Sequence, residues 1–252
     1  MEITTDRSYR TGTIPMKIDV TLSPPEIDQL TQRDLSDTTC IIFDVLRATS
    51  SITTALAHGT LEIYPASTLE EALTLKKTMP HAELGGERHG EKIEGFDRGN
   101  SPLEYKNHLP KKLITTTTNG TVALRACEQA HEILAGTLLN MEAVALHLQR
   151  HSPKQLLLVA AGTFRELALE DVFAAGMLCA RFPNAVLTDA ALTARSVFES
   201  FSTDPLELLK QSKNGKVLLA KGKLDELQWC ARVSSLNTVG VMRAGVIRNE
   251  PS

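Results

Sequence analysis

Thr39-Cys-Ile-Ile-Phe-Asp-Val-Leu-Arg-Ala-Thr-Ser-Ser51 is a short apolar run that changes abruptly into polar and small residues. The apolar run, residues 39–43, is typical of a strand that is covered on both faces of a sheet. A helix is expected from about Ala48 to Ala57, ended by Gly59. A buried strand that leads directly into a helix indicates parallel βαβ units.

The same alternation extends along the chain in both directions. It predicts further strands at residues 17–22, 61–64, 112–115, 132–135, 156–160, 216–219 and 238–242. It predicts further helices at residues 24–35, 67–75, 121–130, 141–149, 169–182, 189–201 and 224–232, the first capped by Ser23. The fold class is therefore α/β: a three-layer α/β/α sandwich with a largely parallel or mixed sheet.

The domain organisation follows from what the chain lacks. No linker rich in Pro, Gly or Ser divides it, so we expect residues 16–252 to form a single domain, with internal subdomains left open. Residues 1–15 are polar, have no apolar core of a secretory signal, and are expected to be a disordered extension.

The amino-acid composition argues against nucleic-acid binding and against a membrane-spanning helix. The net charge of −3 gives no basic face for nucleic acid, and no apolar run approaches the roughly 20 residues of a membrane helix. The four cysteines are scattered without a C-x-x-C pair, which predicts buried reduced thiols in a cytoplasmic protein. A homodimer is left open.

The segment from Leu84 to Pro102 combines five glycines with charged and amide side chains. Its functional candidates are Glu87, Arg88, Asp97 and Asn100. Glycine lets a backbone approach a ligand closely, and carboxylates together with arginines suit a metal ion and a phosphorylated substrate. The alternative is a solvated surface loop.

Polar side chains also follow the predicted strands at 39–43, 112–115 and 156–160. Ligands of open α/β sheets bind outside the carboxyl ends of the strands, so these groups are expected at one rim. They comprise Asp44, Arg47, Thr49 and Ser50, then Thr117, Thr118 and Asn119, and finally Glu170 and Asp171.

Several of these residues are also suited to simpler structural roles. Asp44 could cap the following helix, and Arg47 could form a surface ion pair. The pair Glu170 and Asp171 is equally typical of an acidic first turn. Without paired Cys or His ligands, the carboxylates favour a hard ion, Mg²⁺ first. His89 lies within the glycine-rich segment and is a further candidate for a catalytic acid or a metal ligand.

Four motifs together resemble the 2-phosphosulfolactate phosphatase family. They are Phe43-Asp-Val-Leu-Arg-Ala-Thr-Ser-Ser51, Leu84-Gly-Gly-Glu-Arg88, Gly95-Phe-Asp-Arg-Gly-Asn-Ser-Pro102 and Thr115-Thr-Thr-Thr-Asn-Gly-Thr121. The resemblance covers roughly residues 16–243 and extends to Ala160-Ala-Gly162 and to Glu170 and Asp171.

This resemblance implies Mg²⁺-dependent hydrolysis of (R)-2-phospho-3-sulfolactate to 3-sulfolactate and phosphate, a reaction of coenzyme M biosynthesis. The catalytic set would be Asp44, Arg47, Glu87, Arg88 and Asp97. The substrate would be bound by Thr49, Ser50, Asn100, Thr117, Thr118 and Asn119, and the metal by Asp44, Glu87, Asp97, Glu170 and Asp171.

Two other functions stay open: a phosphatase for another small phosphorylated hydroxy acid, and a non-catalytic anion-binding protein on the same fold. The haloacid dehalogenase pattern is excluded, because it needs a second carboxylate two residues after Asp44, where Leu46 stands. The nucleophile, water or a side chain, is left open.

Overall fold

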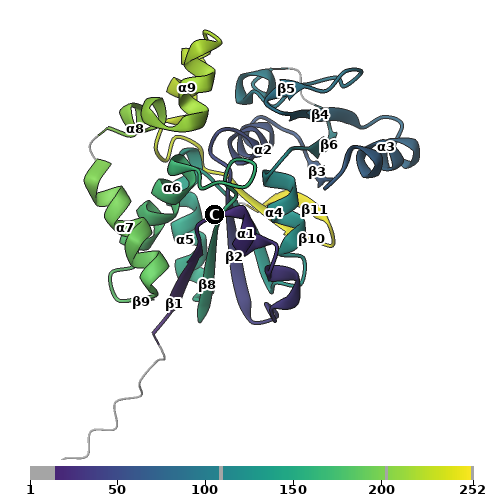
Figure 1. Cartoon of the computed structure of the whole chain (residues 1–252). Coiled ribbons are helices and arrows are strands. Elements are labelled where there is room, and N and C mark those ends of the chain that lie inside the picture. Colours follow the sequence, from purple (N-terminus) through teal and green to yellow (C-terminus); the bar gives the residue numbers. More distant parts are fainter. Residues whose placement is uncertain (1–14, 108–109, 202–203, 251–252) are drawn as a thin grey trace, which may run out of the picture.

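The computed structural model describes residues 15–107, 110–201 and 204–250. Its centre is one sheet of eleven strands in the order β5-β4-β6-β3-β11-β10-β7-β2-β8-β1-β9, with helices on both faces (Figure 1). The predicted α/β/α sandwich with a mixed sheet is therefore confirmed. The predicted extension, residues 1–15, lies outside the described residues except for Pro15.

The strands and helices have the following bounds. The strands are β1 Lys17–Thr21, β2 Thr38–Phe43, β3 Glu62–Pro65, β4 Glu83–Arg88, β5 Glu91–Lys92, β6 Lys112–Thr116, β7 Glu132–Gly136, β8 Gln155–Ala160, β9 Val186–Leu187, β10 Val239–Arg243 and β11 Val246–Glu250. The α-helices are α1 Pro24–Ile27, α2 Ala48–Ala57, α3 Leu69–Thr78, α4 Gly120–Ala126, α5 Met141–His151, α6 Leu169–Ala180, α7 Asp189–Phe201, α8 Pro205–Gln211, α9 Lys213–Ala220 and α10 Leu224–Cys230. Short 3₁₀ helices span Leu30–Gln32, Pro102–Tyr105 and Leu138–Asn140.

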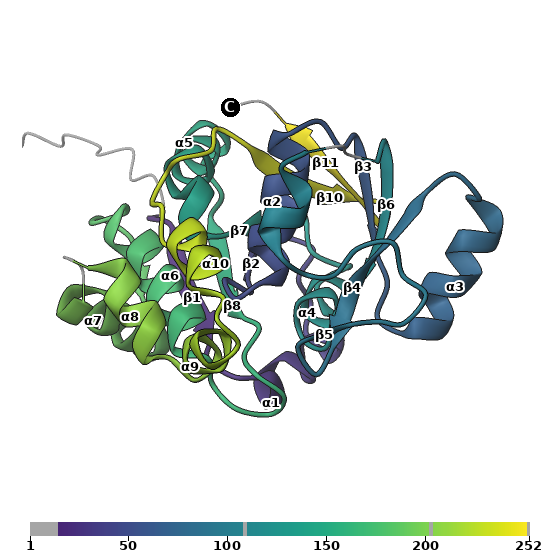
Figure 2. The same ribbon diagram turned by 90° about the horizontal axis from the view of Figure 1, so that it is seen from above.

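The sheet consists of two parallel blocks joined by an antiparallel hairpin. The larger block is β7-β2-β8-β1-β9 and the smaller is β3-β6-β4. The hairpin of β10 and β11 pairs with β7 on one side. On the other side it contacts β3 through one antiparallel bridge, between Ile247 and Ile63. The smaller block and α3 extend away from the larger block in both views (Figures 1 and 2).

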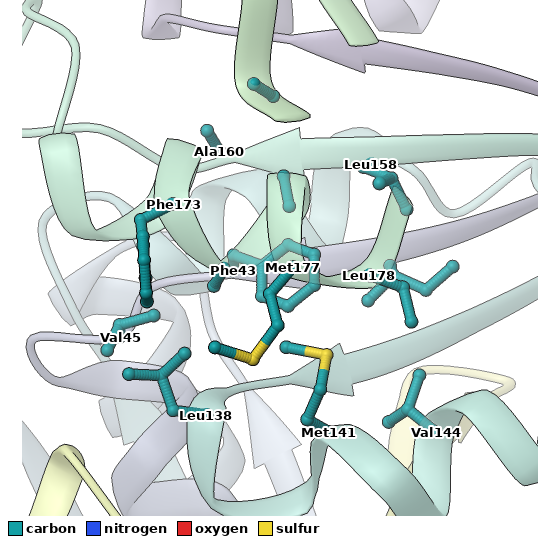
Figure 3. Close-up of a cluster of buried hydrophobic side chains, with 14 of the residues drawn as sticks. Phe43, Val45, Leu138, Met141, Val144, Leu158, Ala160, Phe173, Met177 and Leu178 are labelled. Atoms are coloured by element: carbon teal, nitrogen blue, oxygen red, sulfur yellow. The ribbon is translucent and has the colours of Figure 1, made fainter. Parts of the chain in front are cut away.

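Alternate residues of the central strands pack against opposite layers of helices, because successive side chains of a strand point to opposite faces. Ile41 and Phe43 of β2 contact one layer, together with Leu158 of β8. That layer is formed mainly by α5, α6, α7 and α10; Met141, Phe173 and Met177 contribute to it (Figure 3).

Cys40 and Ile42 of β2 face the other layer, where α2 and α4 pack with α1 and the 3₁₀ segment Pro102–Tyr105. A smaller cluster, which includes Ala72 of α3 and Ile114 of β6, covers the outer block. Cys40, Cys127, Cys179 and Cys230 are all free and buried, as predicted.

Two local predictions were wrong, and further features of the sheet were not foreseen. Residues 216–219 belong to helix α9, not to a strand, because Ser212 caps a helix at Lys213. The helix expected over residues 24–35 ends at Ile27 and is followed by a 3₁₀ turn. The glycine-rich segment begins inside a strand, since Glu83–Arg88 pairs with β6. Strand β11 was not predicted.

Candidate active site

A cavity of about 200 Å³ opens where the carboxyl ends of β2, β4, β6 and β8 come together. These ends belong to both parallel blocks, so the cavity lies at their junction. The residues that line it are Asp44, Leu46, Arg47, Glu87, His89, Gly90, Asn100, Thr118, Asn119, Gly162, Thr163, Phe164, Lys213, Asn214 and Val217.

Asp44 stands directly after β2 at the wall of this cavity, with 8% of its surface exposed. Its Oδ1 accepts the N–H of Ala48, at the start of α2, at 3.0 Å. Burial raises the pKa of the Asp44 carboxyl from 3.8 to about 7, and the charges of Glu87 and Glu170 act in the same direction. Asp44 is therefore both the predicted helix cap and a buried carboxylate with a perturbed pKa.

The approach of α4 to Asp44 depends on Gly120. A Cβ atom at this position would lie 2.5 Å from Asp44 Oδ2 and 2.6 Å from the Cβ of Ala48. The turn glycine of the Thr-rich motif thus allows the first turn of α4 to pack directly against the carboxylate.

Glu170 and Asp171, in the first turn of α6, are buried behind the cavity wall. Asp171 accepts the N–H of Val45 at 2.8 Å and that of Gly162 at 3.0 Å. Burial raises the pKa of both carboxyls, and the charges of Glu170 and Asp44 raise that of Asp171 further. Glu170 Oε1 accepts from Asn214 at 2.7 Å, whereas its buried Oε2 has no partner among the described residues.

Arg47 is the buried cation of the site, with 7% of its surface exposed. Its Nη1 lies 2.5 Å from Oε2 of Glu226, a buried residue of α10, and its Nη2 donates to the carbonyl of Gly90 at 3.3 Å. The predicted alternative of a surface ion pair is wrong, because the partner and the arginine are both buried.

Glu87, at the end of β4, shapes the turn that follows it. Its Oε1 accepts the N–H of Thr118 at 2.7 Å, and its Oε2 accepts the N–H of Gly90 at 2.7 Å and the Thr118 hydroxyl at 3.2 Å. One carboxylate thus links the glycine-rich segment to the Thr-rich motif, and both segments line the cavity.

Two predicted catalytic residues do not line this cavity. Asp97 is exposed, and its Oδ2 accepts the N–H of Leu84 at 2.8 Å. Arg88 donates to the hydroxyl of Thr116 at 2.7 Å and to the carbonyl of Glu87 at 2.8 Å. In the structure both side chains stabilise β4 and its neighbours.

Three predicted substrate-binding hydroxyls are buried and hold the local backbone. Thr49 Oγ1 donates to the carbonyl of Asp44 at 2.9 Å, and Ser50 Oγ to that of Val45 at 2.8 Å. Thr117 Oγ1 accepts the N–H of Thr121 at 3.1 Å. None of the three is among the lining residues.

Thr118, Asn100 and Asn119 do line the cavity. The amide of Asn119 is engaged by the loop after β8: its Nδ2 donates to the carbonyls of Ala161 at 3.0 Å and Phe164 at 3.1 Å, and its Oδ1 accepts the N–H of Phe164. In this arrangement Asn119 positions that loop.

Sequence reasoning missed the contribution of α9. Lys213, Asn214 and Val217 line the cavity, and Asn214 Nδ2 lies 2.7 Å from both Glu170 Oε1 and Thr163 Oγ1. The available signal was Ser212, because serine is a preferred N-cap residue and therefore indicates the start of a helix at Lys213. At the mouth, His89 also stacks on Phe164 with 5.7 Å between the ring centroids.

A separate cluster lies elsewhere in the molecule. Within the described ranges, Glu132, His147 and Glu250 are the one group of three acidic, His or Cys residues whose ligand atoms all lie within 4.8 Å of one another. Arg243 forms ion pairs with both of these glutamates, so a cation already offsets part of their negative charge. We assign no metal to this cluster.

The chain matches known proteins over most of its length. The family model of 2-phosphosulpholactate phosphatase matches residues 25–245. The chain belongs to the 2-phosphosulfolactate phosphatase family. It is 37% identical over 225 residues to a probable 2-phosphosulfolactate phosphatase of Carboxydothermus hydrogenoformans, with 89% of this chain and 92% of the relative covered. It is 37% identical over 246 residues to one of Clostridium perfringens, covering 94% and 98% respectively.

A third relative, from Clostridium acetobutylicum, carries the same name and is 39% identical over 224 residues, which are 86% of this chain and 93% of the relative. The resemblance inferred from the four motifs is confirmed. The names of these relatives describe a phosphatase, which is a phosphoric monoester hydrolase. The predicted enzyme class is therefore confirmed. Among the helices in the described part of the chain, none has the length and apolarity to cross a membrane.

Proposed function

We propose that this protein is a Mg²⁺-dependent phosphatase that hydrolyses (R)-2-phospho-3-sulfolactate to 3-sulfolactate and phosphate. The observation that carries the proposal is a cavity lined by Asp44, Glu87 and Arg47 in a chain of the 2-phosphosulfolactate phosphatase family. Two further buried carboxylates, Glu170 and Asp171, contact the lining residues Asn214 and Gly162. Such a set of carboxylates and one arginine is suited to a metal ion and a phosphate ester.

The residues present fit a hard divalent ion. Glu170 Oε2 is a buried carboxylate oxygen without a partner among the described residues, and an unpaired buried charge is costly unless a cation compensates it. Mg²⁺ is commonly bound by one or two carboxylates, with water and substrate phosphate completing its shell. We assign Asp44 and Glu170 as its protein ligands. When bound, the ion would neutralise phosphoryl charge and orient water.

The protein's own groups would supply the remaining functions. Arg47, fixed by Glu226 and by the carbonyl of Gly90, would bind phosphoryl oxygens and keep the transferred group in place. Glu87 and Asp171, each held by backbone N–H groups, would preserve the shape of the site. Hydrolysis breaks the bond between phosphorus and the ester oxygen, adds the oxygen of water to phosphorus, and leaves a proton on the sulfolactate hydroxyl.

We extend the proposal to two further points. The reaction belongs to coenzyme M biosynthesis, and the protein is located in the cytoplasm. Four free buried thiols are consistent with a reducing compartment. A homodimer stays a prediction.

The test is phosphate release from synthetic 2-phosphosulfolactate, with Mg²⁺ and with EDTA, beside 2-phospholactate and 3-phosphoglycerate. We expect turnover that requires Mg²⁺ and prefers the sulfonated ester. Preference for either of the other esters would support the alternative hydroxy acid substrate. No turnover of any ester by folded protein with Mg²⁺ would support the anion-binding function instead.

A further inference from the structure

We infer that Lys213 binds the anionic group of the substrate that is not transferred, and thereby selects phosphate esters that carry a second anion. The inference rests on the proposed function and assigns the specificity of that site to α9, which lies beside α8 at one end of the molecule (Figure 1).

The first argument is the charge around the cavity. Asp44 and Glu87 line it, and Glu170 and Asp171 are buried behind its wall. A substrate with phosphate, sulfonate and carboxylate groups adds several negative charges. Among the described lining residues, the permanently charged cations are Arg47 and Lys213.

The second argument is that Arg47 is already committed. Its guanidinium is buried and paired with Glu226 at 2.5 Å, and it also holds the Gly90 carbonyl. A planar guanidinium fixed in this way cannot turn toward a second anion, and the phosphoryl group is assigned to its remaining donors. The second anion of the substrate therefore requires another cation, and Lys213 supplies it.

Lys213 is also free to change partners. Its Nζ lies 2.7 Å from Oε2 of Glu166, but 55% of the lysine side chain and 66% of the glutamate side chain are exposed. An ion pair between two such exposed groups is weak, and the lysine stem is long and flexible. An incoming sulfonate or carboxylate can therefore replace Glu166 at small cost.

The backbone of Lys213, in contrast, is held in place. Ser212 caps α9 by accepting the N–H of Gly215 at 3.0 Å. The neighbouring Asn214 is fixed by hydrogen bonds to Glu170 and Thr163. The flexible side chain of Lys213 thus extends from a backbone that is fixed beside Glu170.

The test compares Lys213→Ala with Lys216→Ala, which removes an exposed lysine of the same helix outside the cavity lining. Each variant is assayed with 2-phosphosulfolactate, 2-phospholactate and phenyl phosphate. We expect Lys213→Ala to raise the KM for 2-phosphosulfolactate about ten- to a hundredfold, the effect of losing one hydrogen bond to a charged group, with kcat little changed.

Phenyl phosphate has no second anion, so its kinetics should be unchanged in Lys213→Ala, and Lys216→Ala should behave as wild type throughout. A raised KM for 2-phospholactate as well would assign the carboxylate as the group that Lys213 binds; a change confined to the sulfonated ester would assign the sulfonate. An equal loss with phenyl phosphate, or no change with any ester, would overturn the inference.

Calorimetry with 3-sulfolactate separates this inference from the proposed function, because it needs no turnover. Lys213→Ala should weaken binding of this product by the same factor, and Lys213→Arg should restore most of it. Equal affinities of wild type and Lys213→Ala would reject the role of Lys213 even in an active phosphatase. A difference in affinity without hydrolysis by wild type would reject the phosphatase and retain Lys213 as an anion-binding residue.

Discussion

Asp44 shows how one side chain can serve both the fold and the site. Its Oδ1 caps α2 through Ala48, and its Oδ2 faces the first turn of α4, where only glycine fits. The carboxylate is almost fully buried beside other carboxylates, which raises its pKa to about 7. Such a group is costly in a metal-free protein and valuable once a cation is bound.

Replacement of Asp44 by Asn preserves the shape of the side chain and removes its charge. We expect Asp44→Asn to lower kcat/KM for 2-phosphosulfolactate by at least about a hundredfold, while circular dichroism shows an intact fold. Asp37→Asn, an exposed site away from this cavity, serves as the control. Near-native turnover of Asp44→Asn would remove Asp44 from the catalytic machinery.

The raised pKa of Asp44 also predicts that the stability of the metal-free protein depends on pH. The folded protein retains a proton on Asp44 that the unfolded chain releases between pH 3.8 and about 7, so this group destabilises the metal-free fold as pH rises through that window. In EDTA, Asp44→Asn should match wild type near pH 4 and exceed its free energy of unfolding above pH 7, by up to the order of 4 kcal/mol. Urea unfolding at several pH values measures this, and a constant difference would contradict the raised pKa.

Residue type and strand position predicted Asp44 and Arg47 at the cavity, because Asp44 directly follows a buried strand and Arg47 lies three residues further on. The same reasoning could not tell that Glu87 lines the cavity and that Arg88 does not. Successive residues of a strand point to opposite faces, and the pattern did not reveal that β4 extends to Arg88. Nor could it foresee that Asp97 would bind the N–H of Leu84, since that contact depends on tertiary structure.

Helix α9 carries Lys213, the residue on which the proposed specificity depends. It follows α8 after Ser212 alone, and Gly215 packs so closely on the carbonyl of Leu209 that an added Cβ would overlap the backbone there. The junction of the two helices therefore requires glycine at this position.

Gly215→Ala should open the α8–α9 junction and displace Lys213 and Asn214. We expect a loss of about 1–3 kcal/mol in the free energy of unfolding, the typical range for overpacking at a tight contact, together with a raised KM. Lys216→Ala, on the exposed side of the same helix, should change neither quantity measurably. A stable Gly215→Ala variant with normal KM would show that the junction tolerates a wider spacing.

Strands covered on both faces, such as 39–43 and 156–160, were predictable because a short, continuous apolar run between polar residues favours a buried strand. The run Lys216-Val-Leu-Leu219 was misread as a strand on the same grounds. Of the three apolar residues in this run, only Leu218 is buried in the helix. The side chains of Val217 and Leu219 are 47% and 36% exposed. A short apolar run alone cannot distinguish these outcomes; the cap at Ser212 does.

At the scale of the molecule, the alternation of strands and helices was sufficient to predict a sandwich but not its division into two blocks. That division depends on the hairpin β10–β11 and on the single bridge between Ile247 and Ile63. Long-range pairing of this kind leaves no periodic signal in the sequence. A single domain stays a prediction.

Ile247 is fully buried at this bridge. Ile247→Ala should cost about 2–5 kcal/mol of unfolding free energy and raise the KM, because the smaller block carries Glu87 and Thr118 to the cavity. Val246→Ala, at a half-buried position of the same strand, should cost less than about 1.5 kcal/mol and leave the KM unchanged. A destabilised Ile247→Ala enzyme with normal KM would mean that the blocks keep their relative orientation without this contact.

The cavity between the two blocks has a consequence for how this family can diversify. Its walls belong to two parallel blocks of one sheet, and the hairpin β10–β11 joins these blocks between β3 and β7. A substitution in β10 or β11 can therefore alter the width of the cavity while every residue that touches the ligand stays the same. Natural selection can thus adjust ligand preference through inherited changes remote from the chemistry, and orthologues with identical cavity linings can differ in the esters that they accept.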